Sequence, residues 1–299
     1  IDFIPLPTAA LSALDGSGTV SICEGDVLEL NLTLTGTGPW EVAHDFAGQA
    51  SPLIVNASPF TWDLGAISSS FDVNLLSVFD QSSACTNALN EVVSVTMNPL
   101  PTAGISSDQT ICAGDATSII FNLDPAGASP YDVEWTDGTN ITVSNGIFDG
   151  FEVNPVFSAD GQVCLLSISD NANPTCSSTL NECVDITVND LPSVDITGQV
   201  SICTDDCYDL LLDNFIGQAP FVLEYQVVAQ SNGAVLETQS VAGLQNGDFI
   251  TICPSEAAVV EVLSLSDANT PSCESLTSTG FIIDFIPLPT AALSALDGS

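Results

Sequence analysis

The chain has 299 residues, enough for two or three domains that each bury a core. It contains no Lys or Arg against 38 Asp and Glu, and its formal net charge is −38. Nucleic-acid binding, phosphate transfer and Schiff-base chemistry all need cationic side chains, so this composition excludes them. Docking on an anionic membrane surface is disfavoured for the same reason.

Hydrophobic residues make up 45% of the chain, which favours a folded protein over an acidic disordered one. No run approaches eighteen apolar residues, so we expect no membrane insertion. The ten cysteines lack CxxC clusters and paired histidines, which favours disulfides over zinc and predicts an extracellular location. The chain starts at Ile1 without a basic leader, and we expect an internal fragment or a processed product.

A long repeat organises the chain. Residues 283–299 repeat residues 1–17, IDFIPLPTAALSALDGS, at every position, which gives a period of 282 residues. An identity of this length does not arise by chance, so we expect the parent polypeptide to carry the period many times.

A shorter repeat divides the period into three. A Pro-Leu-Pro or Leu-Pro segment is followed by an Ile-Cys anchor, a Pro-aromatic pair and a Ser-x-x-Asp segment, and a further Cys closes the unit. This order occurs three times. It predicts three domains, at residues 1–98, 99–190 and 191–286, and residues 287–299 begin the next period.

Apolar and polar residues alternate in short runs through each unit. Leu28, Leu30, Leu32 and Leu34 alternate with polar residues, and residues 119–123 repeat this pattern in the second unit. Further strands are expected to begin at Val73, Val163 and Val260, and the aromatic residues after the prolines, Trp40, Tyr131 and Phe221, are expected in cores. About seven short strands in ninety residues predict an all-β protein of tandem immunoglobulin-like β-sandwiches in a linear array.

The cysteines fall two, four and four to a unit, as pairing within each unit requires. The repeated positions predict three disulfides: Cys23–Cys85, Cys112–Cys176 and Cys203–Cys273. By elimination Cys164 is expected to pair with Cys183, and Cys207 with Cys253. A redox-active or metal-binding thiol is the less favoured alternative.

Few other residues suggest a site. His44 stands beside Asp45, but no nucleophile motif accompanies it and the other units lack it, so we interpret it as a structural residue of a strand. Asp80, Asp170 and Asp267 close the Ser-x-x-Asp segments, where a turn whose carboxylate accepts backbone amides is the favoured interpretation. The alternative is a Ca²⁺ site with Asp15 or with the anchor acids Asp26, Asp115 and Asp206. No metal or cofactor is otherwise expected, and no catalytic cluster predicts an enzyme.

The ordered anchors, from Pro-Leu-Pro-Thr through Ile-Cys-x-Gly-Asp to Ser-x-x-Asp and its Cys, resemble the immunoglobulin-like or PKD-like repeats of giant surface adhesins in gliding bacteria. The third unit departs from the pattern, with Asp205 in place of the Gly and an additional Cys207. The resemblance implies a long filament exported by the type IX route, similar to a predatory grappling hook, that holds the cell to substrates or prey.

We therefore expect a structural segment of an extracellular cell-surface filament that carries an adhesive tip. The expected partners are further copies of the chain in a multi-chain filament, and other cell surfaces or substrates. Two alternatives are repeats that adhere through their own loops, for which we find no recurring loop residues beyond turns, and an enzyme, which would need a catalytic cluster in one unit.

Overall fold

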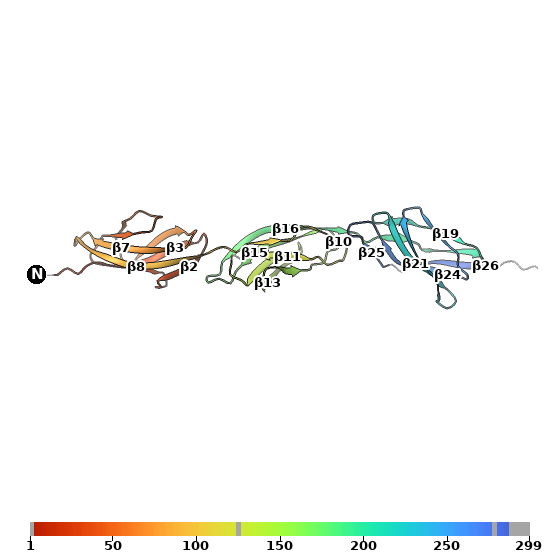
Figure 1. The fold of residues 1–299 in the computed structure, drawn as a ribbon, viewed down its shortest axis with the longest axis horizontal. Helices are drawn as coiled ribbons and strands as arrows, with labels where there is room; N and C mark the ends of the chain where they lie inside the picture. The colour runs from red at the N-terminus through yellow and green to blue at the C-terminus, as the bar shows by residue number, and fades with distance from the viewer. Residues whose placement is uncertain (1–2, 124–126, 277–279, 287–299) are drawn as a thin grey trace, which may run out of the picture. The chain divides into compact units, whose positions relative to one another are not determined.

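The computed structural model describes residues 3–123, 127–276 and 280–286, and these segments contain strands and loops but no helix (Figure 1). The chain is therefore all-β, as predicted. No helix in these segments is long and apolar enough to cross a membrane. The predicted start of the next period, residues 287–299, lies outside the described residues.

The first repeat contains eight strands in two sheets. Its strands are β1 (Thr8–Ala13), β2 (Thr19–Cys23), β3 (Val27–Thr35), β4 (Trp40–His44), β5 (Leu53–Val55), β6 (Phe60–Ala66), β7 (Phe71–Asp80) and β8 (Cys85–Asn98). One sheet has the order β1-β3-β6 and the other the order β2-β8-β7-β4-β5. β2 pairs with β8 in parallel, and the other neighbours in these two sheets are antiparallel. This Greek-key division of successive strands between two sheets is that of an immunoglobulin-like sandwich.

The predicted alternation places the core between these sheets. Leu28, Leu30, Leu32 and Leu34 all lie on the buried face of β3, and they pack in one cluster with Trp40 and Trp62. Because side chains alternate between the two faces of a strand, the period-2 pattern fixes which side of β3 is buried.

The second repeat has the same connectivity. Its strands are β9 (Ala103–Ile105), β10 (Gln109–Cys112), β11 (Ile119–Leu123), β12 (Tyr131–Thr136), β13 (Ile141–Ile147), β14 (Phe151–Val153), β15 (Gly161–Ser169) and β16 (Ser177–Asn189). They form sheets of order β14-β11-β9 and β10-β16-β15-β12-β13. Here too, the first strand of the larger sheet, β10, runs parallel to the last strand of the repeat, β16.

The third repeat varies this plan. Its strands are β17 (Ser193–Asp195), β18 (Gly198–Cys203), β19 (Tyr208–Leu211), β20 (Asp213–Ile216), β21 (Phe221–Ala229), β22 (Val235–Leu244), β23 (Phe249–Ile252), β24 (Ala258–Ser266), β25 (Glu274–Ser275) and β26 (Gly280–Ile286). The larger sheet keeps its order, β18-β26-β24-β21-β22, with β25 beside β24. The smaller sheet is split into two pairs, β17-β20 and β19-β23.

The sequence predicted domain boundaries after residues 98 and 190, and these fall in the loops between β8 and β9 and between β16 and β17. Two compact units divide the chain differently, at residues 1–106, 119–152 and 163–183 for the first and 107–118, 153–162 and 184–299 for the second. Their division runs through the second repeat, so the ninety-residue domains remain a sequence-based prediction.

Strand starts predicted from the sequence agree with the structure to within two residues. Val73, Val163 and Val260 lie in β7, β15 and β24, each two residues after the strand begins. Trp40, Tyr131 and Phe221 are buried, which confirms their assignment to cores.

Candidate functional site: the junction disulfides

The pairing of the repeated cysteines differs from the prediction. The structure joins Cys23 to Cys176 and Cys112 to Cys273, while Cys85 and Cys203 are free thiols. The predicted pairs are therefore wrong: Cys23–Cys85, Cys112–Cys176 and Cys203–Cys273. Each observed bond joins the anchor cysteine of one repeat to the later cysteine of the next repeat, and we call these two bonds the junction disulfides.

The direction of the last strand explains the error. In the parallel pairing of β2 and β8, Cys23 lies opposite Asn98, the last residue of β8, while Cys85 is its first residue. At about 3.3 Å per residue, the 14 residues of β8 separate these ends by roughly 40 Å, whereas a disulfide needs Cα atoms within about 7 Å. Cys112 and Cys176 are separated in the same way, because Cys112 pairs with Asn189 at the end of β16 and Cys176 precedes its start.

The two junction disulfides have matching geometry. Their Cα atoms are 5.6 and 5.5 Å apart, and the bonded residues are 153 and 161 positions apart in the sequence. All four cysteines are buried. Both distances lie at the usual separation for a disulfide, so neither bond requires a shift of the backbone.

A tight turn follows each anchor cysteine. The amide of Asp26 donates to the carbonyl of Cys23 at 3.1 Å, and that of Asp115 donates to Cys112 at 3.0 Å. Gly25 and Gly114 stand inside these turns with φ of 85° and 90°, a region that favours glycine. Glycine at this position of the Ile-Cys-x-Gly-Asp anchor thus lets the chain turn directly after the bonded cysteine.

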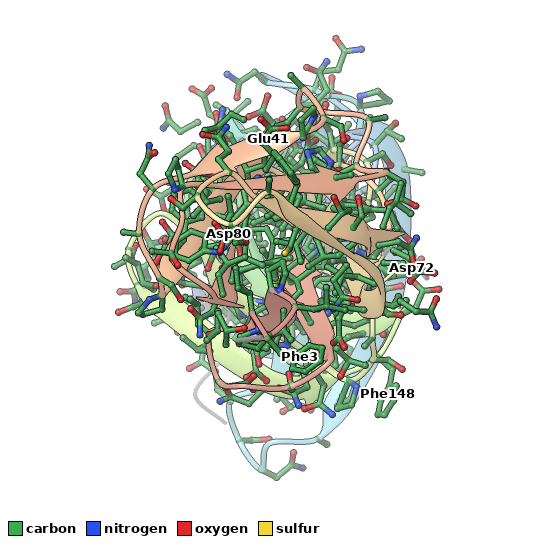
Figure 2. All side chains as sticks on the ribbon, turned by 90° about the vertical axis from the view of Figure 1, so that its left-hand side faces the viewer. Phe3, Glu41, Asp72, Asp80 and Phe148 are labelled. Carbon is green, nitrogen blue, oxygen red and sulfur yellow. A yellow bond between two sulfur atoms is a disulfide. The ribbon has the colours of Figure 1, made fainter. Side chains whose placement is uncertain are left out.

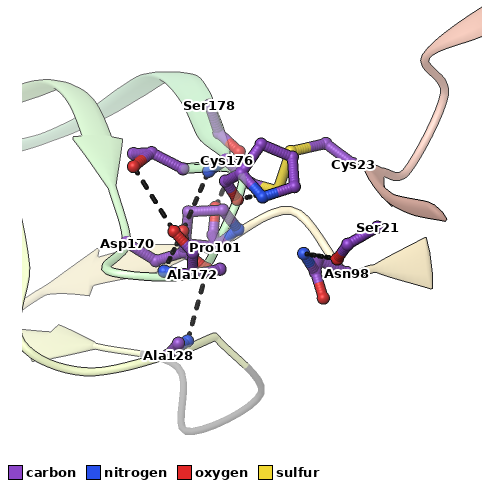
Figure 3. The surroundings of a disulfide bond; sticks show 11 residues. Ser21, Cys23, Asn98, Pro101, Ala128, Asp170, Ala172, Cys176 and Ser178 are labelled. Carbon is purple, nitrogen blue, oxygen red and sulfur yellow. Dashed lines mark hydrogen bonds between the residues drawn. A yellow bond between two sulfur atoms is a disulfide. The ribbon is translucent and has the colours of Figure 1, made fainter. Parts of the chain in front are cut away.

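On the other side of each bond, an aspartate holds the loop that carries the second cysteine. Asp170 accepts a hydrogen bond from the amide of Cys176 at 2.9 Å (Figure 3), and Asp267 accepts one from the amide of Cys273 at 2.9 Å. Asp170 also accepts hydrogen bonds from the backbone amides of Ala128 and Ala172. These contacts confirm the turn interpretation of the repeated aspartates. Each of the two carboxylates accepts the amide of a cysteine that belongs to a junction disulfide.

The equivalent Asp80 of the first repeat is also buried. It accepts hydrogen bonds from the amides of Thr37, Ser82 and Ser83. Because these donors, Thr37 foremost, stabilise the charged form, the pKa of the Asp80 carboxyl lies below its usual value.

The proline linkers are held at the same points. Ser178, two residues after Cys176, donates to the carbonyl of Pro101 at 2.7 Å (Figure 3), and Ser275, two residues after Cys273, donates to Pro192 at 2.5 Å. Asn87, two residues after Cys85, donates to the carbonyl of Pro7 at 2.9 Å. Each repeat therefore binds the linker that enters it with the side chain two positions after its later cysteine.

Two further disulfides lie within single repeats, and we call them the inner disulfides. Cys164 pairs with Cys183, and Cys207 pairs with Cys253, which confirms both predictions made by elimination. Their Cα atoms are 4.1 and 4.2 Å apart. Cys164 and Cys183 lie in the adjacent strands β15 and β16, so this bond joins neighbours that the sheet already pairs.

His44 is buried in β4 and has a structural environment. Its Nε2 atom lies 3.2 Å from the carbonyl oxygen of Ala50, and its ring centre lies 4.7 Å from that of Trp62. The neighbouring Asp45 instead bonds both nitrogens of Asn74, and the backbone amide of Asn74 lowers the pKa of the Asp45 carboxyl. The hydrogen bonds of the two adjacent side chains thus go to different partners, Ala50 for His44 and Asn74 for Asp45.

The carboxylates of this acidic chain are dispersed. Within residues 3–123, 127–276 and 280–286 no three His, Cys, Asp or Glu residues group as metal ligands would. Asp26, Asp115 and Asp206, the candidate calcium ligands, are exposed, and Asp15 bonds the amide of Ser17 at 2.8 Å. Figure 2 shows the side chains along the chain, with Glu41, Asp72 and Asp80 of the first repeat labelled. The chain has no Lys or Arg with which these acids could form ion pairs.

No family model matches the chain. A segment of 172 residues is 28% identical to the nucleoporin pom152 of Schizosaccharomyces pombe, which covers 55% of this chain and 13% of that protein. The chain thus spans about an eighth of the length of this curated relative.

Solved structures with similar folds include a marsupial T cell receptor and the D1–D4 ectodomain fragment of ICAM-5. The first has a TM-score of 0.37 at 10% identity and covers 91% of this chain and all of its own. The second has a TM-score of 0.38 at 10% identity and covers 97% of this chain and 80% of its own. The fibronectin(III)-like modules of Clostridium thermocellum CbhA have a TM-score of 0.30 at 13% identity, covering 61% and 95%.

Proposed function

We propose that this chain is a load-bearing segment of an extracellular filament at a cell surface. The observation that carries the proposal is the pair of junction disulfides, which join successive repeats at equivalent positions. Disulfides persist in oxidising, extracytoplasmic surroundings, which supports the proposed location. A net charge of −38, from 38 Asp and Glu without Lys or Arg, favours extended chains because like charges repel.

The disulfides shorten the covalent path that a pulling force follows. From Cys23 the force crosses to Cys176, follows the chain to Cys207, crosses to Cys253 and continues to Cys273. Residues outside this path bear no tension even when their strands unfold. At about 3.4 Å per extended residue, the fully stretched chain would then measure roughly 340 Å from end to end.

Removal of the junction disulfides lengthens this path far more than removal of the inner ones. Without the two junction bonds, only the loops closed by the inner bonds are bypassed, and the stretched length rises to roughly 800 Å. Without the two inner bonds, the force path instead runs from Cys176 back to Cys112 and across to Cys273, and the length is roughly 390 Å. The arrangement of the junction bonds therefore limits how far the protein extends under load.

Single-molecule force spectroscopy tests this role directly. The full chain would be tethered at its two ends and pulled until every repeat has unfolded, with the oxidised wild type compared with two variants. One variant replaces the four junction cysteines with Ser, and the matched control replaces Cys164, Cys183, Cys207 and Cys253. We expect final lengths of roughly 340 Å for the wild type, roughly 800 Å for the junction variant and roughly 390 Å for the control variant. A wild-type length equal to that of the junction variant would refute the proposal.

The filament itself is tested on the native cell surface by electron microscopy with an antibody against this chain. The antibody should decorate fibres that project from the cell. A fibre of roughly 25 Å, the thickness of one β-sandwich, indicates a single-chain stalk. A fibre several times thicker indicates the multi-chain filament that we expect, with copies of the chain packed side by side. Labelling confined to the cell interior would contradict the proposal.

A further inference from the structure

We infer that Cys203 of each period forms a third junction disulfide with Cys85 of the period that follows it in the same polypeptide. These are the two cysteines that carry no bond in the structure. Cys203 is the anchor cysteine of the third repeat, and Cys85 is the later cysteine of the first. They are therefore the same two kinds of position that the junction disulfides join elsewhere in the chain.

Cys203 occupies the same position in its sheet as the bonded anchor cysteines Cys23 and Cys112. In the parallel strand pairs, Cys23 lies opposite Asn98, Cys112 opposite Asn189 and Cys203 opposite Ile286, each at the end of the last strand of its repeat. The amide of Asp206 donates to the carbonyl of Cys203 at 3.1 Å, as in the other two anchor turns.

The turn after Cys203 keeps its shape although its glycine is replaced. Asp205 adopts φ of 71°, the left-handed conformation that Gly25 and Gly114 adopt with ease. Thus the third repeat adopts the same anchor turn with a residue that disfavours it. Cys203 differs from Cys23 and Cys112 in being exposed rather than buried, as expected of an anchor whose partner lies outside the chain.

Cys85 shares two features with the later cysteines Cys176 and Cys273, although it is half-buried where they are buried. The linker that enters its repeat is held by Asn87 through the carbonyl of Pro7, as Ser178 and Ser275 hold the two later linkers. Asp80 holds the turn before Cys85 by accepting the amides of Thr37, Ser82 and Ser83, whereas Asp170 and Asp267 hold theirs by accepting, among others, the amide of the later cysteine itself. The first repeat thus has the linker contact and the aspartate turn that accompany the later cysteine of a junction disulfide.

In the sequence, the third repeat leads into a second copy of the segment that precedes the first repeat. Ile283–Ile286 repeat Ile1–Ile4, so the end of β26 continues into the same Pro-Leu-Pro linker that Asn87 binds in the first repeat. With an offset of 282 residues, Cys85 of the next period follows Cys203 by 164 residues, because 85 plus 282 exceeds 203 by that number. The two junction disulfides close comparable separations of 153 and 161 residues.

The bond forms by thiol–disulfide exchange with an oxidised dithiol donor. The Cys203 thiolate attacks the donor disulfide and displaces one donor thiolate. The Cys85 thiolate then attacks the mixed disulfide, which releases the second donor thiolate and leaves Cys203–Cys85. Two protein thiols lose two electrons and two protons, and the donor disulfide gains them as a dithiol.

The consequence is a ladder of disulfides that does not end with the period. Every repeat would then be joined covalently to the repeat before it and to the repeat after it, in addition to the linkers. The inference goes beyond the load-bearing role within one chain, because it concerns the connection between periods. Its failure would leave the force measurement on Cys23–Cys176 and Cys112–Cys273 unaffected.

A tandem protein tests the inference, with residues 1–282 followed by the full chain 1–299 and production in an oxidising compartment. The forward variant carries Cys85→Ser in its first copy and Cys203→Ser in its second, which keeps the two cysteines of the inferred bond. The reverse variant carries Cys203→Ser in the first copy and Cys85→Ser in the second. It keeps the same number of thiols at the two outer positions.

Both purified monomers would be alkylated without reduction, cleaved at Asp and Glu, since the chain has no Lys or Arg, and mapped by mass spectrometry. We expect no alkylated cysteine and one Cys203–Cys85 cross-linked peptide in the forward variant, and two alkylated cysteines in the reverse variant. The four disulfides already assigned in each copy report that both proteins have folded.

Two results would overturn the inference. The first is a forward variant in which Cys203 and Cys85 are both alkylated although the other disulfides have formed. The second is a bond from either cysteine to another partner, such as Cys85 to Cys23 of its own copy.

Discussion

The junction and inner disulfides have different relations to the repeat. The junction bonds join residues 153 and 161 positions apart, from one repeat to the next, and their cysteines stand at positions that all three repeats share. The inner bonds join residues 19 and 46 positions apart, and the other repeats lack their cysteines.

This difference separates two uses of the same bond. An inner disulfide reinforces one repeat, so a repeat without it still folds, as the first repeat shows by forming both sheets with no disulfide of its own. A junction disulfide belongs to the contact between successive repeats, and it recurs because that contact recurs. The predictions below test this distinction, from the largest expected effect to the smallest.

Removal of a junction disulfide should destabilise the protein more than removal of an inner one. In the chain-entropy model, closing 153 residues with Cys23–Cys176 stabilises the fold by about 5 kcal/mol, and closing 19 with Cys164–Cys183 by about 3 kcal/mol. We expect these losses for Cys23→Ser with Cys176→Ser and for Cys164→Ser with Cys183→Ser, measured by denaturant unfolding of the full chain. Equal losses would mean that the junction bond acts locally, like an inner one.

The sequence was sufficient to predict the strands because alternation is a local property. Leu30 and Leu32 lie on one face of β3 whatever the rest of the chain does, so their burial follows from the pattern alone. The turn role of Asp170 was predictable for the same reason, since its partners Ala172 and Cys176 are near in sequence.

The junction pairs were not predicted, because an even number of cysteines in each repeat fits pairing within repeats and between them equally well. The length of the strand that begins at Cys85 could have excluded the pairing within the first repeat. If β8 runs unbroken to the linker, Cys85 lies at one end of the repeat and the anchor Cys23 at the other. The parallel pairing that places Cys23 beside Asn98 joins residues far apart in sequence, and no local pattern reports it.

The aspartate beside a junction disulfide should matter through its hydrogen bonds. Asp170→Asn retains the size of the side chain but presents an amide group to the donating N–H of Ala128, Ala172 or Cys176. Since an unmet buried donor costs about 1–3 kcal/mol, we expect a loss of about 2 kcal/mol in the free energy of unfolding. Glu182→Gln, at an exposed position of β16, removes the same charge and should leave stability unchanged.

The same experiment on Asp80 adds a pH dependence, because hydrogen bonds from Thr37, Ser83 and Ser82 lower the pKa of this carboxyl in the folded chain. A lowered folded pKa gives stability that is present above the unfolded value of 3.8 and is lost as the pH falls through the folded value. Wild type should therefore exceed Asp80→Asn in stability by a constant amount above about pH 5, with the difference shrinking below about pH 4.

Comparison with Glu91→Gln, an exposed substitution of equal charge in β8, separates this effect from the general relief of repulsion among the acids at low pH. A difference between wild type and Asp80→Asn that does not change between pH 7 and pH 3 would contradict the assigned role of the Asp80 carboxylate.

The smallest effect concerns the anchor turns, where the third repeat departs from the other two. Asp205 holds φ of 71° at the position that Gly25 and Gly114 occupy with φ of 85° and 90°. A left-handed conformation costs an L-residue roughly 1–2 kcal/mol, part of which Asp avoids through local hydrogen bonds. We therefore expect Asp205→Gly to stabilise the chain by up to about 1 kcal/mol and Gly114→Asp to destabilise it by a similar amount. If Asp205→Gly instead destabilised the chain, the side chain of Asp205 would itself support the turn, and the unbonded anchor at Cys203 would differ from the bonded ones in more than its missing partner.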